Sequence, residues 1–154
     1  MKQGEVGFTI EFGRPGVGVW FRDIEKMTQA LAKAKVPFER KNPLTLLMSD
    51  VATGKLKEDI LGEKVLSAIV EIKVTVDRTE EVVRIVHEVE KDINTVVALG
   101  VSTRCDENGE ENVVRPILER LGYRIARAKT NTGLGRVTNR DEDEVRSQVE
   151  AATI

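Results

Sequence analysis

The stretch KVLSAIVEIKVTV, residues 64–76, limits most strongly what this chain can fold into. Apolar residues recur at every second position on one side, at Leu66, Ala68, Val70, Ile72, Val74 and Val76. Most of the intervening positions are polar or charged, among them Glu71 and Lys73. Side chains alternate between the two faces of a β-strand, so this period of two predicts a long strand with one buried face.

The remaining segments predict an α+β fold. Alternation at Phe8, Ile10 and Phe12 indicates a first strand, and residues 38–50 and 93–101 are expected to form two more. Apolar residues recur at helical spacing over residues 21–36, 77–92 and 113–121. The order βαββαβ predicts a ferredoxin-like two-layer sandwich, extended by a C-terminal αβ unit whose strand would cover residues 123–129.

Two consequences for organisation follow from this order. Residues 1–136 are expected to form a single domain. Residues 137–154 carry a run of charged residues and are expected to form a tail or a short helix. Because no helix separates residues 38–50 from residues 64–76, the two segments are expected to pair as a hairpin.

Composition excludes several classes of function. A formal charge of −2 over 154 residues gives no basic field for nucleic acid or an anionic membrane. No apolar stretch is long enough to span a membrane, and the first residues lack the apolar core of a signal peptide, so a cytoplasmic location is expected. One cysteine and one histidine make neither a disulfide nor a metal cage, and no cofactor is predicted.

Three glycine-rich or hydroxyl-rich loops are candidate anion sites. Such loops can present backbone N–H groups to an anion, and arginine adds a forked donor. If residues 123–129 form a strand parallel to residues 93–101, the second and third loops emerge at the same sheet edge and converge. The candidate ligand residues are Arg14 in the first loop, Ser102, Thr103 and Arg104 in the second, and Asn131, Thr132, Gly133, Gly135 and Arg136 in the third.

Each loop also has a purely structural interpretation. GRPGVGVW, residues 13–20, matches no phosphate-binding motif and is favoured as a turn. GVSTRCDENGE, residues 100–110, is equally well explained as a helix-entry loop in which Asp106 or Asn108 is the cap, and TNTGLGR, residues 130–136, as an exit into the tail.

Three functions remain after these exclusions. The leading prediction is a regulatory domain that binds an anionic small molecule or nucleotide and has no catalysis of its own. The alternative is an accessory protein for assembly, of a kind that would suit an archaeal enzyme system, or a homo-oligomer. It would use an open sheet face on which Leu47, Val65 and Ile69 form an apolar patch. The third is an enzyme of unrecognised type, although no catalytic constellation is present and Cys105 has no evident base.

Overall fold

The computed structural model describes residues 1–110 and 113–123. Chain contacts divide the protein after Arg124, so every described residue belongs to the first unit, Met1–Arg124. The predicted domain boundary at residues 136 and 137, and the predicted strand at residues 123–129, lie outside the described residues apart from Tyr123.

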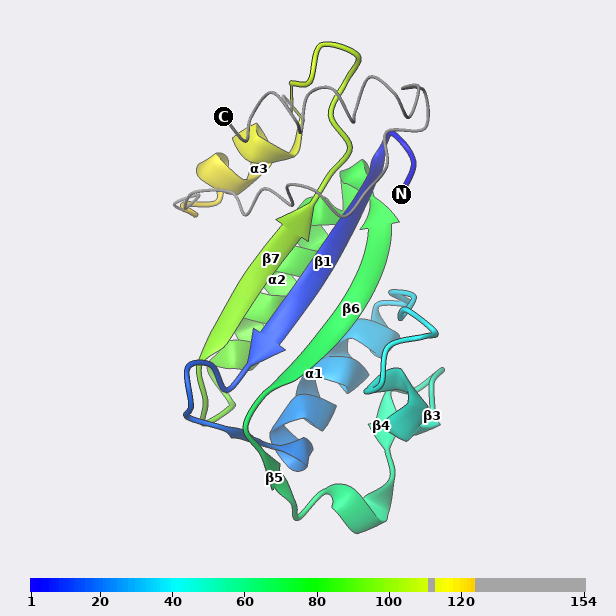
Figure 1. Ribbon diagram of the computed structural model, residues 1–154, viewed down its shortest axis with the longest axis vertical. Helices are drawn as coiled ribbons and strands as arrows, with labels where there is room; N and C mark the ends of the chain where they lie inside the picture. Colours follow the sequence, from blue (N-terminus) through cyan, green and yellow to red (C-terminus); the bar gives the residue numbers. More distant parts are fainter. Residues whose placement is uncertain (111–112, 124–154) are drawn as a thin grey trace, which may run out of the picture. The chain divides into compact units, whose positions relative to one another are not determined.

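The described part is an α+β structure built on a three-stranded antiparallel sheet, as Figure 1 shows. The central strand β1 (Glu5–Phe12) pairs with β6 (Ala68–Thr75) on one side and with β7 (Val97–Ser102) on the other. Of the predicted hairpin between residues 38–50 and 64–76, only an isolated antiparallel bridge from Phe38 to Ile72 forms, with a hydrogen bond beside it from the Glu39 N–H to the Glu71 carbonyl.

Two amphipathic helices cover one face of this sheet. They are α1 (Phe21–Lys33) and α2 (Thr79–Glu90), and both lie behind the sheet in Figure 1. The third helix, α3 (Val114–Arg120), contacts α2 and ends two residues before Gly122, whose φ of +84° is typical of the position that stops a helix. The three helices predicted from apolar periodicity are confirmed, with ends within a few residues of the expected ones.

The core lies between this sheet face and the two helices. Each apolar side chain buried there contributes about 1.5–3 kcal/mol relative to full exposure. The alternation in the sequence selects these residues correctly on β1 and β6, since every second residue is buried. The core is formed by Val6, Phe8, Ile10 and Phe12 of β1, Val70, Ile72 and Val74 of β6, Ile24, Met27 and Leu31 of α1, and Val82, Val83 and Val86 of α2.

The predicted strand at residues 38–50 is mostly absent. Thr45–Leu47 forms a 3-10 helix, and only Met48–Asp50 (β3) is extended. The Asn42 side chain accepts a hydrogen bond from the backbone N–H of Leu44 and donates one to Glu71, which favours a local turn over a strand. Leu46, which would share the inner face of such a strand with Leu44 and Met48, is 66% exposed.

Four short strands flank α1 and lie outside the main sheet. β3 pairs with β4 (Lys55–Leu56), and β2 (Val19–Trp20) pairs with β5 (Lys64–Val65). Leu66, which the alternation placed on the inner face of a strand spanning residues 64–76, is 79% exposed because it lies between β5 and β6. The prediction of an apolar patch on the open face is also wrong, because its three residues lie on three different elements. Ile69 lies on β6, whereas Val65 lies on β5 and Leu47 in the 3-10 helix.

Candidate functional site

The predicted site residues of the first two loops lie at opposite ends of the sheet. Ser102 ends β7 opposite Gly7, and Thr103 and Arg104 follow it. Arg14 lies beyond Phe12, at the other end of β1. Five residues of antiparallel strand separate Gly7 from Phe12, which is roughly 17 Å. Arg14 therefore does not share a site with Ser102.

Both loops make internal contacts that account for their shape. Arg14 forms an ion pair with Glu11 at 3.2 Å. The carboxylate of Asp106 accepts hydrogen bonds from the backbone N–H groups of Asn108 and Glu110, both at 2.9 Å. The third predicted loop, with Asn131, Thr132, Gly133, Gly135 and Arg136, lies outside the described residues.

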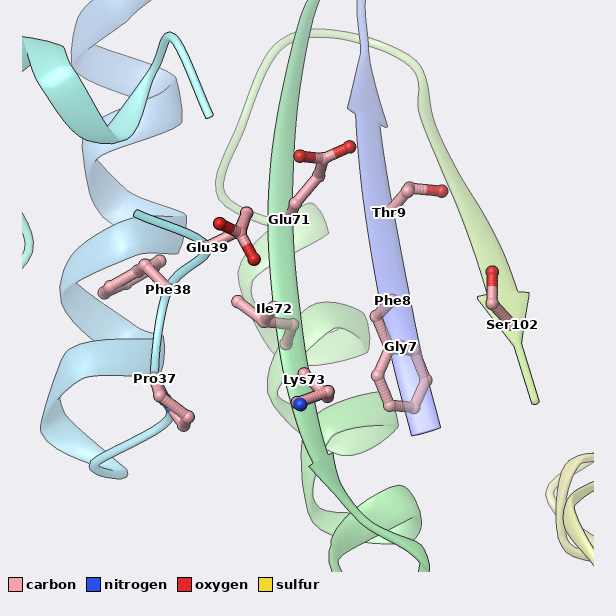
Figure 2. Close-up of a pocket in the computed structure, with 10 residues that line it drawn as sticks. All are labelled: Gly7, Phe8, Thr9, Pro37, Phe38, Glu39, Glu71, Ile72, Lys73 and Ser102. Atoms are coloured by element: carbon pink, nitrogen blue, oxygen red, sulfur yellow. The ribbon is translucent and has the colours of Figure 1, made fainter. Parts of the chain in front are cut away.

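The open face of the sheet contains a shallow hollow of about 360 Å³, shown in Figure 2. Thr9, Ser102 and Lys73 line it together with two carboxylates, Glu39 and Glu71. Its one cation is already engaged, because Lys73 forms a 3.1 Å ion pair with Glu5. This arrangement of charge disfavours an anion.

A larger hollow, of about 590 Å³, lies on the outer face of α1 and suits an anion much better. We call it the lysine groove, after the three lysines that line it. Lys26, Ala30 and Lys33 share one face of α1, because they are spaced four and three residues apart along a helix. The other lining residues are Gln29, Ala52, Thr53, Lys55, Val89 and Asp92.

One wall of the lysine groove is the turn between β3 and β4, which is fastened to α1. Gly54 is buried, and its carbonyl accepts a hydrogen bond of 2.6 Å from the hydroxyl of Thr28. The backbone N–H of Leu56 donates to the Glu25 carboxylate at 3.0 Å. These two bonds hold the wall residues Thr53 and Lys55 beside α1.

The turn itself is stabilised by Asp50. Its carboxylate accepts hydrogen bonds from the Thr53 hydroxyl at 2.7 Å and from the Ala52 N–H at 2.9 Å. These bonds, first of all the one from Thr53, lower the pKa of Asp50 below its ordinary value. The carboxylate is therefore charged at neutral pH and fixes the shape of the wall.

The opposite wall is the end of α2, and Lys26 joins it to α1. The Lys26 ammonium forms an ion pair with Asp23 at 2.9 Å and donates a hydrogen bond of 2.8 Å to the carbonyl of Asp92. Because the Asp23 side chain is only 8% exposed, its charge needs this partner. Lys26 therefore has a structural role, since it links α1 to the end of α2.

Lys33 and Lys55 have no comparable structural role within the described part of the chain. The Lys33 ammonium makes no hydrogen bond or ion pair with any residue in 1–110 or 113–123. The Lys55 ammonium makes no direct contact there either, and it attracts the exposed Asp50 carboxylate only at longer range. The groove thus presents two available cations to a ligand.

No sequence motif marks the lysine groove. The spacing of Lys26, Gln29 and Lys33 on one helix face is visible in the sequence, but surface lysines with this spacing are common on solvated helices. Lys55 and Val89 reach α1 only through tertiary contacts between distant segments. No local pattern reports such contacts.

Metal and membrane chemistry find no support in the described segments. They contain no group of three or more His, Cys, Asp and Glu side chains arranged to hold a metal ion. Their helices include none with the length and apolar character needed to cross a membrane. In comparisons with known proteins, no family model, curated protein or solved structure matches the chain.

Proposed function

We propose that this protein is a binding module for an anionic small molecule, without catalysis of its own, and that the lysine groove holds the ligand. The observation that carries the proposal is the convergence of Lys26, Lys33 and Lys55 on one groove of about 590 Å³. That volume falls within the range of small-molecule sites, which combine apolar walls with a few convergent polar groups.

Lys33 and Lys55 are the ligand contacts in this proposal, because Lys26 is committed to Asp23 and Asp92. Both ammonium groups are exposed, so their attraction for an anion is screened by salt over about 10 Å at 0.1 M ionic strength. Binding is therefore expected to weaken as salt is added. Binding to the folded state also raises the thermal midpoint by mass action.

The test is thermal denaturation against a panel of carboxylates, sugar phosphates and nucleotides at low ionic strength. We expect at least one anion to raise the midpoint for the natural chain. Lys33→Met and Lys55→Met should abolish that rise, because they remove the charge while keeping the apolar stem. Lys57→Met is the matched control, since Lys57 is exposed and does not line the groove. A rise that survives both groove variants would refute the site.

The loop at Ser102, Thr103 and Arg104 remains a second proposed location for the anion. Support comes from the two hydroxyl groups and the guanidinium that follow one another at the end of β7, because arginine supplies a forked donor for an anion. Arg104→Ala and Arg136→Ala separate this location from the lysine groove. If they abolish the rise and the groove variants do not, the loop is the site.

A second candidate function is assembly with another protein through the edge of β7. Among the described residues, β7 pairs only with β1, and its sequence VALGVS contains no charge or proline. Natural edge strands usually carry such protection against pairing with other chains. The opposite edge, on β6, is partly covered, because the Glu39 N–H donates to the Glu71 carbonyl at 2.9 Å.

Ala98→Lys tests the assembly proposal without disturbing the sheet. Ala98 is exposed and lies opposite Glu11 on β1, so the new lysine gains a cross-strand partner of opposite charge. If β7 is an interface, the natural chain associates in light scattering and the variant is monomeric. Equal masses for both chains would exclude this edge.

We further propose that the fold is ferredoxin-like, with one edge strand reduced to a single bridge. The order β7-β1-β6, followed by the bridge from Ile72 to Phe38, is what that topology requires of its four strands. The connections through α1 and α2 agree with it. The predicted C-terminal αβ unit begins with α3, and its strand lies outside the described residues.

A further inference from the structure

The lysine groove has apolar as well as charged components. Ala30 and Ala52 are small, and Val89 presents a branched apolar side chain from α2. The stems of Lys33 and Lys55 add methylene groups, because lysine buries its stem while its ammonium stays in water. Apolar lining of this kind adds affinity only for a ligand that has an apolar body.

The distribution of charge is uneven along the groove. Lys33 is the last residue of α1, and it lies roughly 10 Å along the helix axis from Lys26. At the Lys26 end lie Asp92, whose backbone carbonyl accepts a hydrogen bond from Lys26, and the end of α2, where carbonyl groups carry partial negative charge. The Lys26 ammonium is already bonded to Asp23 and Asp92. Lys33 therefore offers an available cation at the far end of α1, and Lys55 offers a second one from the β3–β4 turn, whose residues Gly54 and Leu56 are bonded to α1.

We propose that the ligand of the lysine groove is an amphiphilic organic anion, with one anionic head and an apolar body. This inference rests on the proposed function and specifies its ligand class. The head, a carboxylate or a phosphate monoester, binds the ammonium groups of Lys33 and Lys55. The body lies over Ala30 and against Val89. A second anionic group at the far end would meet Asp92, so compact polyanions are poor ligands.

The test is isothermal titration of the full chain with butanoate, hexanoate and octanoate at constant ionic strength. Each methylene transferred from water to an apolar surface tightens binding by about fourfold, so hexanoate is expected to bind about 15-fold tighter than butanoate. Hexyl phosphate compares the two head groups. Hexanol and inorganic phosphate test the body and the head alone, and each should bind far more weakly than hexanoate.

Val89→Thr keeps the shape of the side chain and replaces one methyl group by a hydroxyl. It should weaken hexanoate binding severalfold while changing butanoate binding little. Ala30→Leu fills the floor of the groove from an outward-facing helix position and should abolish octanoate binding. Val17→Thr is the matched control, because Val17 is 47% exposed in a loop that does not line the groove.

The outcomes separate this inference from the proposed function. Equal affinities along the series, with binding still lost in Lys33→Met, would overturn the amphiphilic ligand but keep an anion site. Tight binding of inorganic phosphate would have the same meaning. No binding of any anion, or binding unaffected by Lys33→Met and Lys55→Met, would overturn both. A rising series that Val89→Thr flattens would support both.

Discussion

Gly54→Ala is expected to be one of the most damaging single-methyl substitutions in the chain. Gly54 has a φ of +73°, a conformation that costs alanine about 1–2 kcal/mol. A Cβ atom at this position would also lie closer than 3.0 Å to the backbone carbonyl of Thr28. Backbone atoms of α1 cannot turn aside as a side chain can, so the wall of the lysine groove must move away.

Moving the wall breaks the hydrogen bond of 2.6 Å between the Thr28 hydroxyl and the Gly54 carbonyl. Leaving a buried polar group without its partner costs about 1–3 kcal/mol. Together with the cost of the backbone conformation, the free energy of unfolding should fall by about 2–5 kcal/mol. For a domain of this size each kcal/mol lowers the thermal midpoint by roughly 3 °C, so the expected drop is roughly 6–15 °C.

Gly16→Ala provides the matched control. Gly16 has a similar φ of +71°, but a Cβ atom there would meet nothing within 4 Å. Both variants share the backbone cost, so the difference between them isolates the close approach of the wall to α1. Urea denaturation and calorimetry measure both variants. If the two substitutions cost the same free energy, the tight packing of the turn against α1 is wrong.

Three further perturbations test the same account. Arg78→Met should lower the free energy of unfolding, measured by urea denaturation, by about 1–3 kcal/mol. The reason is that the Arg78 guanidinium donates a hydrogen bond of 2.7 Å to the Ala34 carbonyl at the end of α1 and forms an ion pair with Glu81. A loss below about 0.5 kcal/mol would contradict this role. An NMR titration should find the pKa of Asp50 below the ordinary value of about 3.9, and an ordinary pKa would contradict the bond from Thr53. Because the folded-state pKa is lowered, the charged Asp50 carboxylate stabilises the fold fully above about pH 3.9. That stabilisation is lost as the pH falls through the folded-state pKa. Thr53→Val should return the Asp50 pKa towards its ordinary value, and an unchanged pKa would show that the hydroxyl is not the main cause.

Much of the fold could be predicted because its signals are local. The alternation of buried and open positions on β1 and β6, and the helical stripes of α1 and α2, depend on residues within one element. The choice of strand partner is not local. The predicted hairpin between residues 38–50 and 64–76 needed such distant pairing along its whole length, and only the bridge from Phe38 to Ile72 forms.

The burial of β7 shows the same limit. A nearly continuous apolar sequence such as VALGVS is typical of a strand buried on both faces, but within the described chain β7 is an edge strand, and Ala98 is exposed. Candidate sites were harder still to predict. A glycine-rich loop predicted Arg14 as a ligand residue, but Arg14 pairs with Glu11. Lys33 and Lys55 line one groove only because segments far apart in the sequence lie together in the fold.

The most direct test of the central claim is a map of amide chemical-shift changes on adding hexanoate to the isotope-labelled protein. The account predicts saturable changes at Gln29, Ala30, Lys33 and Thr53, which line the lysine groove. Those changes should be absent in Lys33→Met. Changes centred on Ser102 and Arg104 instead, or no saturable change anywhere, would contradict the claim that the groove between α1, the β3–β4 turn and the end of α2 binds anions.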